Sequence, residues 1–159
     1  EGIGAKLTLS LWDCAIDLLV NQAQNAIISG KNPVPMGSSH PNLVPYRAYK
    51  TLDSEFVIAV GSDEQWEKLV LALRLEIPLD SDWSKNSQRV EDRKLVDAMI
   101  SKSVKQLTSS ELESLLDGIP CAPVNSIKQA LSDPNSTERG MLSSTLGIKH
   151  VSSPHRFHN

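Results

Sequence analysis

The 159-residue sequence has little of several residue types that mark particular classes of protein. Its two cysteines, Cys14 and Cys121, are too few for a disulfide framework and have no CxxC spacing, which favours a reducing compartment. The formal net charge is −3, so no basic excess points to a nucleic-acid partner. The longest mostly apolar stretch, residues 11–28, is interrupted by aspartate, asparagine and glutamine and is too polar to span a bilayer. We therefore expect neither a nucleic-acid nor a membrane partner.

Motifs that reveal a catalytic centre by their spacing are also missing. The histidines, at positions 40, 150, 155 and 158, show neither HxxxH nor HExxH spacing, so the sequence predicts no metal site. No GxSxG elbow occurs, and no base is apparent as a partner for Cys121, which lies between Pro120 and Pro123. Helix caps, turns and solvated faces account for most of the many aspartates. The residues alone therefore predict no catalytic residue in this chain.

The first third of the sequence contains one helical pattern and one loop. Residues 6–10 alternate polar and apolar side chains, which predicts a short strand. Residues 11–29 carry apolar side chains at three- and four-residue steps, and this pattern predicts one long helix that Gly30 ends. Residues 31–45 hold four prolines and Gly37, so we expect an exposed or active loop.

A hairpin and a helix are predicted next. Residues 46–51 and 55–60 flank the polar turn 52–54, which is typical of a β-hairpin. Ser62 and Gln65 have the spacing of a capping box, in which the first residues of a helix satisfy each other's unpaired polar groups.

Further helices and strands complete the chain. A helix is predicted over 87–106, with Val90, Leu95, Val96, Met99 and Ile100 facing inward and Arg89, Arg93 and Lys94 facing outward. Thr108 and Glu111 repeat the capping box and open a third helix. Residues 119–125 are predicted as turns, 126–133 as a short helix that Asp133-Pro134 closes, and the segment from Leu142 onward as one or two strands.

Six phrases carry a resemblance that no single motif provides. They are GIGAKLTLSLWD (2–13), MGSSHPNLVPYRAYKTLDSEFVIAVGSDEQW (36–66), RVEDRKLV (89–96), GIPCAPVNSI (118–127), DPNSTERGM (133–141) and PHRF (154–157). In this order they are similar to GxGQxVDxSLxD, GNxHPxxxPYxxFxTxDGxxxIAxGNDxQW, RVxNRxxL, GVPCGPVNxI, DPQxxxRxM and PxRF. The chain thus resembles the class III CoA-transferases, the family of the formyl-CoA, carnitine and succinate-hydroxymethylglutarate CoA-transferases, more than their acyl-CoA racemase relatives.

The sequence departs from the family phrases at several positions. Ala5 replaces a glutamine, and Ser54 replaces the glycine of the hairpin turn. Ser38 and Ser62 replace asparagines but keep the capacity to form hydrogen bonds. These changes suggest drift or a specialised member.

The resemblance implies an α/β fold: a small α/β domain of short antiparallel hairpins packed on helices, preceded by a strand and a long helix of a Rossmann-like large domain. Residues 1–30 are expected to form this strand and helix of the incomplete large domain, and 31–45 the linker loop. Residues 46–141 are expected to form the small domain, and 142–159 the return strands and linker toward the rest of the large domain.

The resemblance also implies a function for the full-length protein. Family members exchange CoA between an acyl-CoA and a carboxylic acid through intermediates on a catalytic aspartate, and their subunits form interlocked homodimers. The aspartate belongs to a segment before residue 1, and the chain covers the middle of the family sequence. We therefore expect an intracellular CoA-transferase part, in the cytoplasm, a mitochondrion or a peroxisome, that alone binds no cofactor and transfers no CoA, with acyl-CoA as a substrate of the full-length protein.

In the family, the loop between the linker helix and the sheet of the small domain lies at the mouth of the active site. The active-site loop candidates in this sequence are therefore Gly37, Ser38, Ser39 and His40, although a purely structural role for His40 in a turn remains an alternative. Glycine and serine amides can donate hydrogen bonds to an oxyanion without adding bulk.

Two other hypotheses about the chain stay open. The chain is alternatively a shortened, non-catalytic paralogue that acts as a binding or assembly module. A third hypothesis is that the chain alone associates with itself through the apolar stripe of residues 11–29.

Overall fold

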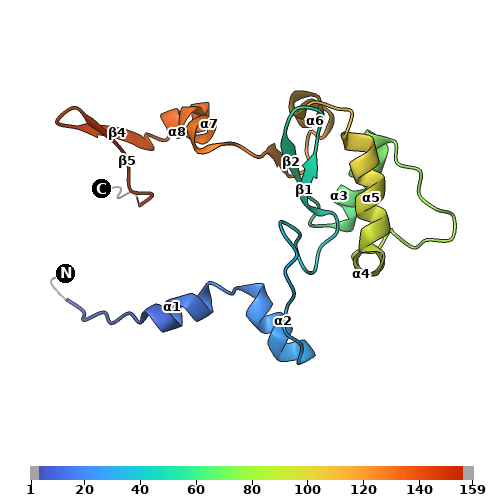
Figure 1. The fold of residues 1–159 in the computed structure, drawn as a ribbon, viewed down its shortest axis with the longest axis horizontal. Helices are drawn as coiled ribbons and strands as arrows, with labels where there is room; N and C mark the ends of the chain where they lie inside the picture. Colours follow the sequence, from blue (N-terminus) through green and yellow to red (C-terminus); the bar gives the residue numbers. More distant parts are fainter. Residues whose placement is uncertain (1–3, 156–159) are drawn as a thin grey trace.

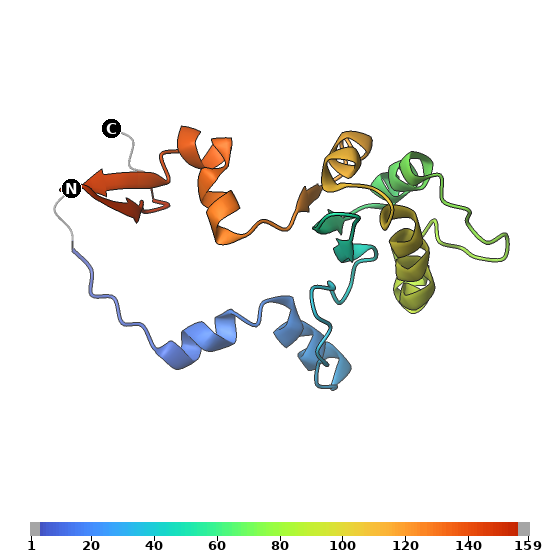
Figure 2. The ribbon, with the colours of Figure 1, turned by 45° about the horizontal axis from the view of Figure 1, so that its top comes forward.

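The computed structural model describes residues 4–155, which form a body with two arms. Residues 36–124 make up the body, residues 4–35 the N-terminal arm and residues 125–155 the C-terminal arm. Both arms leave the body on the same side in both views (Figures 1 and 2). Three earlier observations extend beyond the described residues: His158, the end of the PHRF phrase, and the start of the GIGAKLTLSLWD phrase.

A three-stranded antiparallel sheet organises the body. Strands β1 (Tyr46–Lys50) and β2 (Glu55–Ala59) form the predicted hairpin, in which Tyr49 pairs with Phe56. The prediction of turns over 119–125 is wrong in part, because β3 (Cys121–Pro123) pairs with β2 at the sheet edge. Proline lacks an N–H and masks strand character in a sequence, yet an edge strand accommodates it because one side of the strand forms no ladder.

Four helices complete the body: α3 (Asp63–Leu73), α4 (Asn86–Glu91), α5 (Arg93–Val104) and α6 (Ser109–Leu115). Of these, α5 packs on β1 and α6 on β3, while α3 and α4 pack against α5. The capping box of Thr108 and Glu111 is present at the start of α6. At α3, Ser62 Oγ accepts from the Gln65 amide as predicted, but the Gln65 side chain accepts from the Gly61 amide and not from that of Ser62.

The predicted helix over 87–106 is broken in two, and two of its side chains face the opposite way. Asp92 has non-helical backbone angles and separates α4 from α5, while its carboxylate accepts a hydrogen bond from Trp83 Nε1 at 2.8 Å. Arg89, predicted to face outward, is 1% exposed, and Leu95, predicted to face inward, is 62% exposed. The break shifts the helical phase, so one continuous apolar stripe could not describe both segments.

The hydrophobic core lies between the sheet and the helices of the body. Phe56 and Ile58 contribute from β2, and Leu69, Ile100 and Leu112 contribute from α3, α5 and α6. Val44, Tyr49, Val60, Trp66, Leu73, Leu75, Trp83, Val96, Val104, Leu116 and Ile119 complete this core. The observed architecture confirms the predicted α/β class with short antiparallel hairpins packed on helices.

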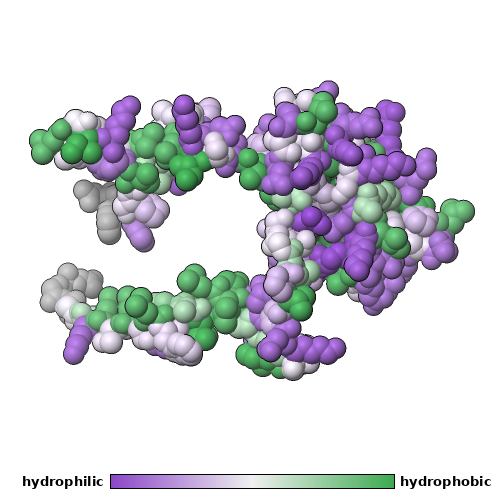
Figure 3. Space-filling model, in the orientation of Figure 1, coloured by the Kyte–Doolittle hydropathy of each residue, from purple (hydrophilic) through white to green (hydrophobic). Residues whose placement is uncertain are grey.

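The N-terminal arm differs from its predicted form. Residues 6–10 form no strand, because a strand needs a neighbour for its backbone hydrogen bonds and none of the described residues pairs with them. The predicted single helix is two helices, α1 (Leu11–Asp17) and α2 (Asn21–Ser29), which are separated at Val20, where φ is +48°. Neither helix buries a residue fully, and hydrophobic side chains lie along the arm surface (Figure 3).

The C-terminal arm contains α7 (Ile127–Ser132), α8 (Pro134–Glu138) and the hairpin of β4 (Leu142–Thr145) with β5 (Ile148–Val151). The strands after Leu142 are confirmed. Asp133 does not simply close a helix, because its side chain accepts from the Asn135 amide and caps α8, in which Pro134 is the first residue. Proline at the first helical position needs no intrahelical partner for its nitrogen.

Candidate functional site

The loop from Met36 to His40 begins with a tight turn. The Ser39 amide donates to the Met36 carbonyl at 3.1 Å, and Gly37 has a φ of +61°, where glycine avoids the strain of a side chain. Ser38 Oγ accepts a hydrogen bond from the Ala48 amide at 3.1 Å and so ties the turn to β1. Within the described residues, the amide N–H groups of Gly37 and Ser38 have no hydrogen-bond acceptor. Two adjacent donors therefore remain available at this turn.

His40 is held by neighbours on both sides. Its amide donates to the Tyr46 carbonyl at 2.8 Å, and its ring stacks on that of Tyr46 with centroids 5.1 Å apart. The ring nitrogen Nδ1 accepts from the Asn42 amide at 3.1 Å, and Nε2 lies 3.3 Å from the side-chain amide of Asn21. Burial, and second the charge of Arg93, lower the pKa of His40 from 6.5. The hydrogen bonds and the stacking hold the His40 ring in place beside the loop. The lowered pKa of His40 favours the neutral imidazole over the imidazolium.

Two paired amides connect the N-terminal arm to this loop. Asn25 and Asn42 exchange hydrogen bonds in both directions, each at 3.0 Å, through their side-chain amides. Asn21 lies one helical turn before Asn25 on α2 and contacts His40. One polar edge of α2 therefore sets the position of the arm beside the candidate loop.

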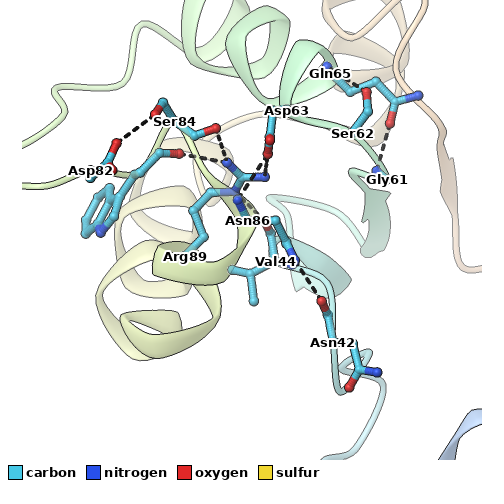
Figure 4. A network of polar contacts seen from close by, with 11 residues as sticks. Asn42, Val44, Gly61, Ser62, Asp63, Gln65, Asp82, Ser84, Asn86 and Arg89 are labelled. Carbon is cyan, nitrogen blue, oxygen red and sulfur yellow. Dashed lines mark hydrogen bonds and ion pairs between the residues drawn. The ribbon is translucent and has the colours of Figure 1, made fainter.

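Arg89 joins three separate segments of the body (Figure 4). Its Nε donates to the Val44 carbonyl at 2.8 Å, and Nη1 donates to the carbonyls of Trp83 at 2.7 Å and Ser84 at 3.0 Å. Its Nη2 donates to Asp63 Oδ1 at 2.7 Å. Two of the phrases quoted above, the one that holds Val44 and Asp63 and the one that begins with Arg89, therefore meet around one guanidinium.

Asn86 extends this network toward the loop. Its amide donates to Asp63 Oδ1 at 3.0 Å, and its side chain accepts from the Val44 amide and donates to the Asn42 carbonyl. The guanidinium of Arg89 also lies over the Trp66 ring, 5.0 Å from the centroid. The loop after His40 is thus fixed by α3 and α4, although neither Arg89 nor Asn86 was predicted as a site residue.

A second polar cluster joins β1 to α5. Two of the quoted phrases contain Arg47, Tyr49 and Arg93, but no local pattern predicted that these residues would meet at Asp97. Asp97 is buried on α5, and its Oδ1 accepts from the Tyr49 hydroxyl at 2.6 Å. Its Oδ2 lies 3.4 Å from Arg47 Nη1, and Arg93 Nη2 donates to the Pro41 carbonyl at 2.7 Å. Burial, followed by the nearby charge of Asp97, raises the pKa of Tyr49 and keeps its hydroxyl protonated.

Two carboxylates of the body accept hydrogen bonds from neighbouring side chains, and the pKa of one thiol is shifted. Asp63 and Asp97 are held by Arg89 and Tyr49, as described above. Burial, and second the charge of Glu113, raise the pKa of the Cys121 thiol, which opposes formation of the reactive thiolate. Among residues 4–155, no group of three or more histidine, cysteine, aspartate or glutamate side chains is arranged to hold a metal ion. No helix in the described part of the chain is long and apolar enough to cross a membrane.

A comparison with models of protein families shows to which family the chain belongs. The family model described as CoA-transferase family III matches residues 1–159. This chain belongs to CoA-transferase family III. The resemblance of the six phrases is therefore confirmed over the whole sequence, including the candidate loop and the Arg89 network.

Several curated relatives are CoA-transferases with succinate or succinyl-CoA in their names. A succinate–glutarate CoA-transferase from Agrobacterium fabrum is 32% identical over 144 residues, which cover 89% of this chain and 36% of the relative. A succinyl-CoA:mesaconate CoA-transferase from Haloarcula marismortui is 30% identical, and the match covers 89% of this chain and 36% of that protein. The chain thus spans about a third of the length of the curated relatives it matches.

Solved structures share this fold. A CaiB/BaiF family protein from Brucella suis is 36% identical, with a TM-score of 0.76 over 93% of this chain and 40% of that protein. The protein Rv3272 from M. tuberculosis has a TM-score of 0.77 at 19% identity, covering 94% of this chain and 39% of that protein, and supports the fold alone.

Proposed function

We propose that this family III chain is part of a CoA-transferase that moves CoA from succinyl-CoA, or a similar acyl-CoA, to a dicarboxylic acid. The observation that carries the proposal is the set of relatives at 30% identity or more, whose names join succinate or succinyl-CoA with glutarate or mesaconate. In this proposal residues 46–141, which include the sheet and helices of the body together with α7 and α8, form the small domain. Residues 1–30 and 142–159 belong to the large domain, and two complete subunits form an interlocked dimer.

The covalent step is proposed for a catalytic aspartate outside these residues. Its carboxylate oxygen forms a bond to the acyl carbon while the bond from that carbon to sulfur breaks, which leaves a mixed anhydride and CoA thiolate. The thiolate then attacks the aspartyl carbonyl, releasing the first carboxylic acid and giving an aspartyl-CoA thioester. The acceptor carboxylate then attacks the aspartyl carbonyl and releases the CoA thiolate, which leaves a second mixed anhydride. The thiolate attacks the acyl carbon of the acceptor in this anhydride, which gives the new acyl-CoA and frees the aspartate.

The candidate loop would support each of these attacks. A tetrahedral oxyanion develops whenever a carboxylate or thiolate adds to a carbonyl, and preorganised N–H donors lower the energy of that charge. The amides of Gly37 and Ser38 are exposed donors without an acceptor in the described chain, and Gly37 adds no side chain between them and a ligand. His40, Asn42 and Arg89 hold the loop ends, so the donors are positioned before substrate arrives.

Substitution of Gly37 tests this function in the protein that carries this chain. Gly37→Ala places a side chain in open space at a φ of +61°, so we expect a modest loss of stability but a fall in kcat of ten-fold or more. Gly118→Ala is the matched control, because its φ is +77°, its added atom also meets nothing, and it lies away from the loop. Equal kcat values for the two variants would argue against a role of the Gly37 and Ser38 amides in catalysis. A wild-type protein without CoA exchange would refute the proposed transferase function.

The exposed arms favour one second candidate, a non-catalytic binding or assembly module. Their apolar side chains require a covering surface whether or not catalysis occurs. The CoA-exchange assay separates the two proposals, because a module transfers no CoA when its partner is supplied.

A further inference from the structure

A depression on the body gathers positive charge although the whole chain carries a net charge of −3. It has a volume of about 430 Å³ and lies between the candidate loop, β1 and α5. Its lining residues are Met36, Ser39, Arg47, Arg93, Lys94, Asp97, Ala98 and Ser101. Three cations therefore face one carboxylate at the side of the turn that contains Gly37.

That single carboxylate does not neutralise the cluster. Asp97 already accepts the Tyr49 hydroxyl at 2.6 Å, and its contact with Arg47 is long, at 3.4 Å, for an ion pair that shares a hydrogen. Lys94 forms no salt bridge with any described residue. The positive charges in the depression thus exceed what Asp97 can balance.

Donors in the depression are also left unused. Arg93 uses Nη2 to hold the Pro41 carbonyl, and Arg47 uses Nε to hold that of Ala48 and Nη1 to reach Asp97. In residues 4–155, no acceptor is found for Arg47 Nη2, for Arg93 Nε and Nη1, or for the Ser39 hydroxyl. Their unused donors match an anion with several acceptor oxygens.

We propose that Arg47 and Arg93 bind the non-reacting carboxylate of a dicarboxylic substrate, with Lys94 adding long-range attraction. The proposal rests on the CoA-transferase function proposed above, because the depression borders Ser39, next to the donors assigned to the reacting carbonyl. A planar guanidinium donates two parallel hydrogen bonds to a carboxylate, which fixes the acid at its far end. A monocarboxylic acid of equal length leaves these donors unpaired and gains nothing from the site.

The kinetic test compares two acceptor acids, glutarate and pentanoate, in the protein that carries this chain. Arg47→Gln and Arg93→Gln are expected to raise the KM for glutarate about ten-fold or more, with a smaller change in kcat, and to change the KM for pentanoate much less. Because Arg93 also holds the Pro41 carbonyl, its variant is expected to lose some activity with both acids. Lys102→Gln is the control, because it removes a charge from α5 outside the depression. Equal increases in the KM values for both acids would contradict the proposed carboxylate site, because damage to the loop impairs the reaction with any acceptor acid.

A binding measurement separates failure of the anchor from failure of the transferase. Titration of the same protein with glutarate, followed by the NMR signals of arginine Nε–H groups, is expected to shift Arg47 and Arg93 in the wild type, and pentanoate is expected to shift neither. If CoA exchange is absent but these shifts occur, the carboxylate site stands and the transferase function falls. If inorganic phosphate or CoA shifts the signals and glutarate does not, the depression is a phosphate site and the proposal is wrong.

Discussion

Arg89 and Asp63 lie 26 residues apart in the sequence, yet Nη2 of the arginine donates to Oδ1 of the aspartate at 2.7 Å. The arginine side chain is 1% exposed, whereas that of Asp63 is 54% exposed. The two partners therefore depend on the contact to different degrees: Asp63 can turn to water, but a buried guanidinium relies on its protein acceptors.

Replacement of Arg89 is expected to destabilise the body severely. Arg89→Met keeps much of the volume but leaves the carbonyls of Val44, Trp83 and Ser84 without their donor, so the free energy of unfolding should fall by about 3 kcal/mol. Asp63→Asn keeps an oxygen acceptor in partial contact with water and should have a smaller effect. Urea unfolding measures both, and similar losses for the two variants would contradict the central role of Arg89.

Removing the Tyr49 hydroxyl tests the buried contact with Asp97. Tyr49→Phe deletes the donor at 2.6 Å and should lower the free energy of unfolding by about 2 kcal/mol at neutral pH. Because the folded protein raises the pKa of Tyr49 from 10.0, above about pH 10 the unfolded chain releases this proton while the folded chain retains it. The wild type should therefore lose stability at alkaline pH faster than Tyr49→Phe, and parallel pH profiles would refute this.

The protonation of His40 reports the position of the loop. An NMR titration of the imidazole should give a pKa below 6.5, because burial and the charge of Arg93 disfavour the imidazolium. Below about pH 6.5 the unfolded chain takes up this proton before the folded one does, so this contribution to stability falls as the pH decreases. Arg93→Gln should raise the pKa part of the way, and Lys102→Gln should not, whereas an equal shift in both would indicate a general charge effect.

Local signals in the sequence predicted the elements whose cause is local. The hairpin of β1 and β2 follows from alternating side chains around a polar turn, and the start of α6 follows from Thr108 and Glu111. The loop candidates Gly37, Ser38, Ser39 and His40 came from the family resemblance, and their roles at the active site stay predictions. Their shared loop and its unused amides are structural observations.

Long-range contacts decided the features that the sequence could not predict. Arg89 is polar and sits on a short helix, so only its acceptors at Val44 and Asp63 explain why it faces inward. β3 depends on pairing with β2 across more than sixty residues, and Pro123 within it and Pro120 just before it conceal it from any local rule. The cluster at Asp97 arises in the same way, because Arg47 and Tyr49 come from a strand and Asp97 from a helix.

The N-terminal arm is expected to make the isolated chain associate with itself. Trp12 and Leu18 are 75% and 78% exposed, and α1 buries no residue, so burial of these side chains against another molecule is favourable. Size-exclusion chromatography at two concentrations should show a larger species at the higher one. The double variant Trp12→Gln, Leu18→Gln should reduce it without disturbing the core, whereas Leu79→Gln, on an isolated exposed site of the body, should not. If the wild type is a monomer at both concentrations, the exposed apolar side chains of the N-terminal arm do not drive self-association, and the prediction is wrong.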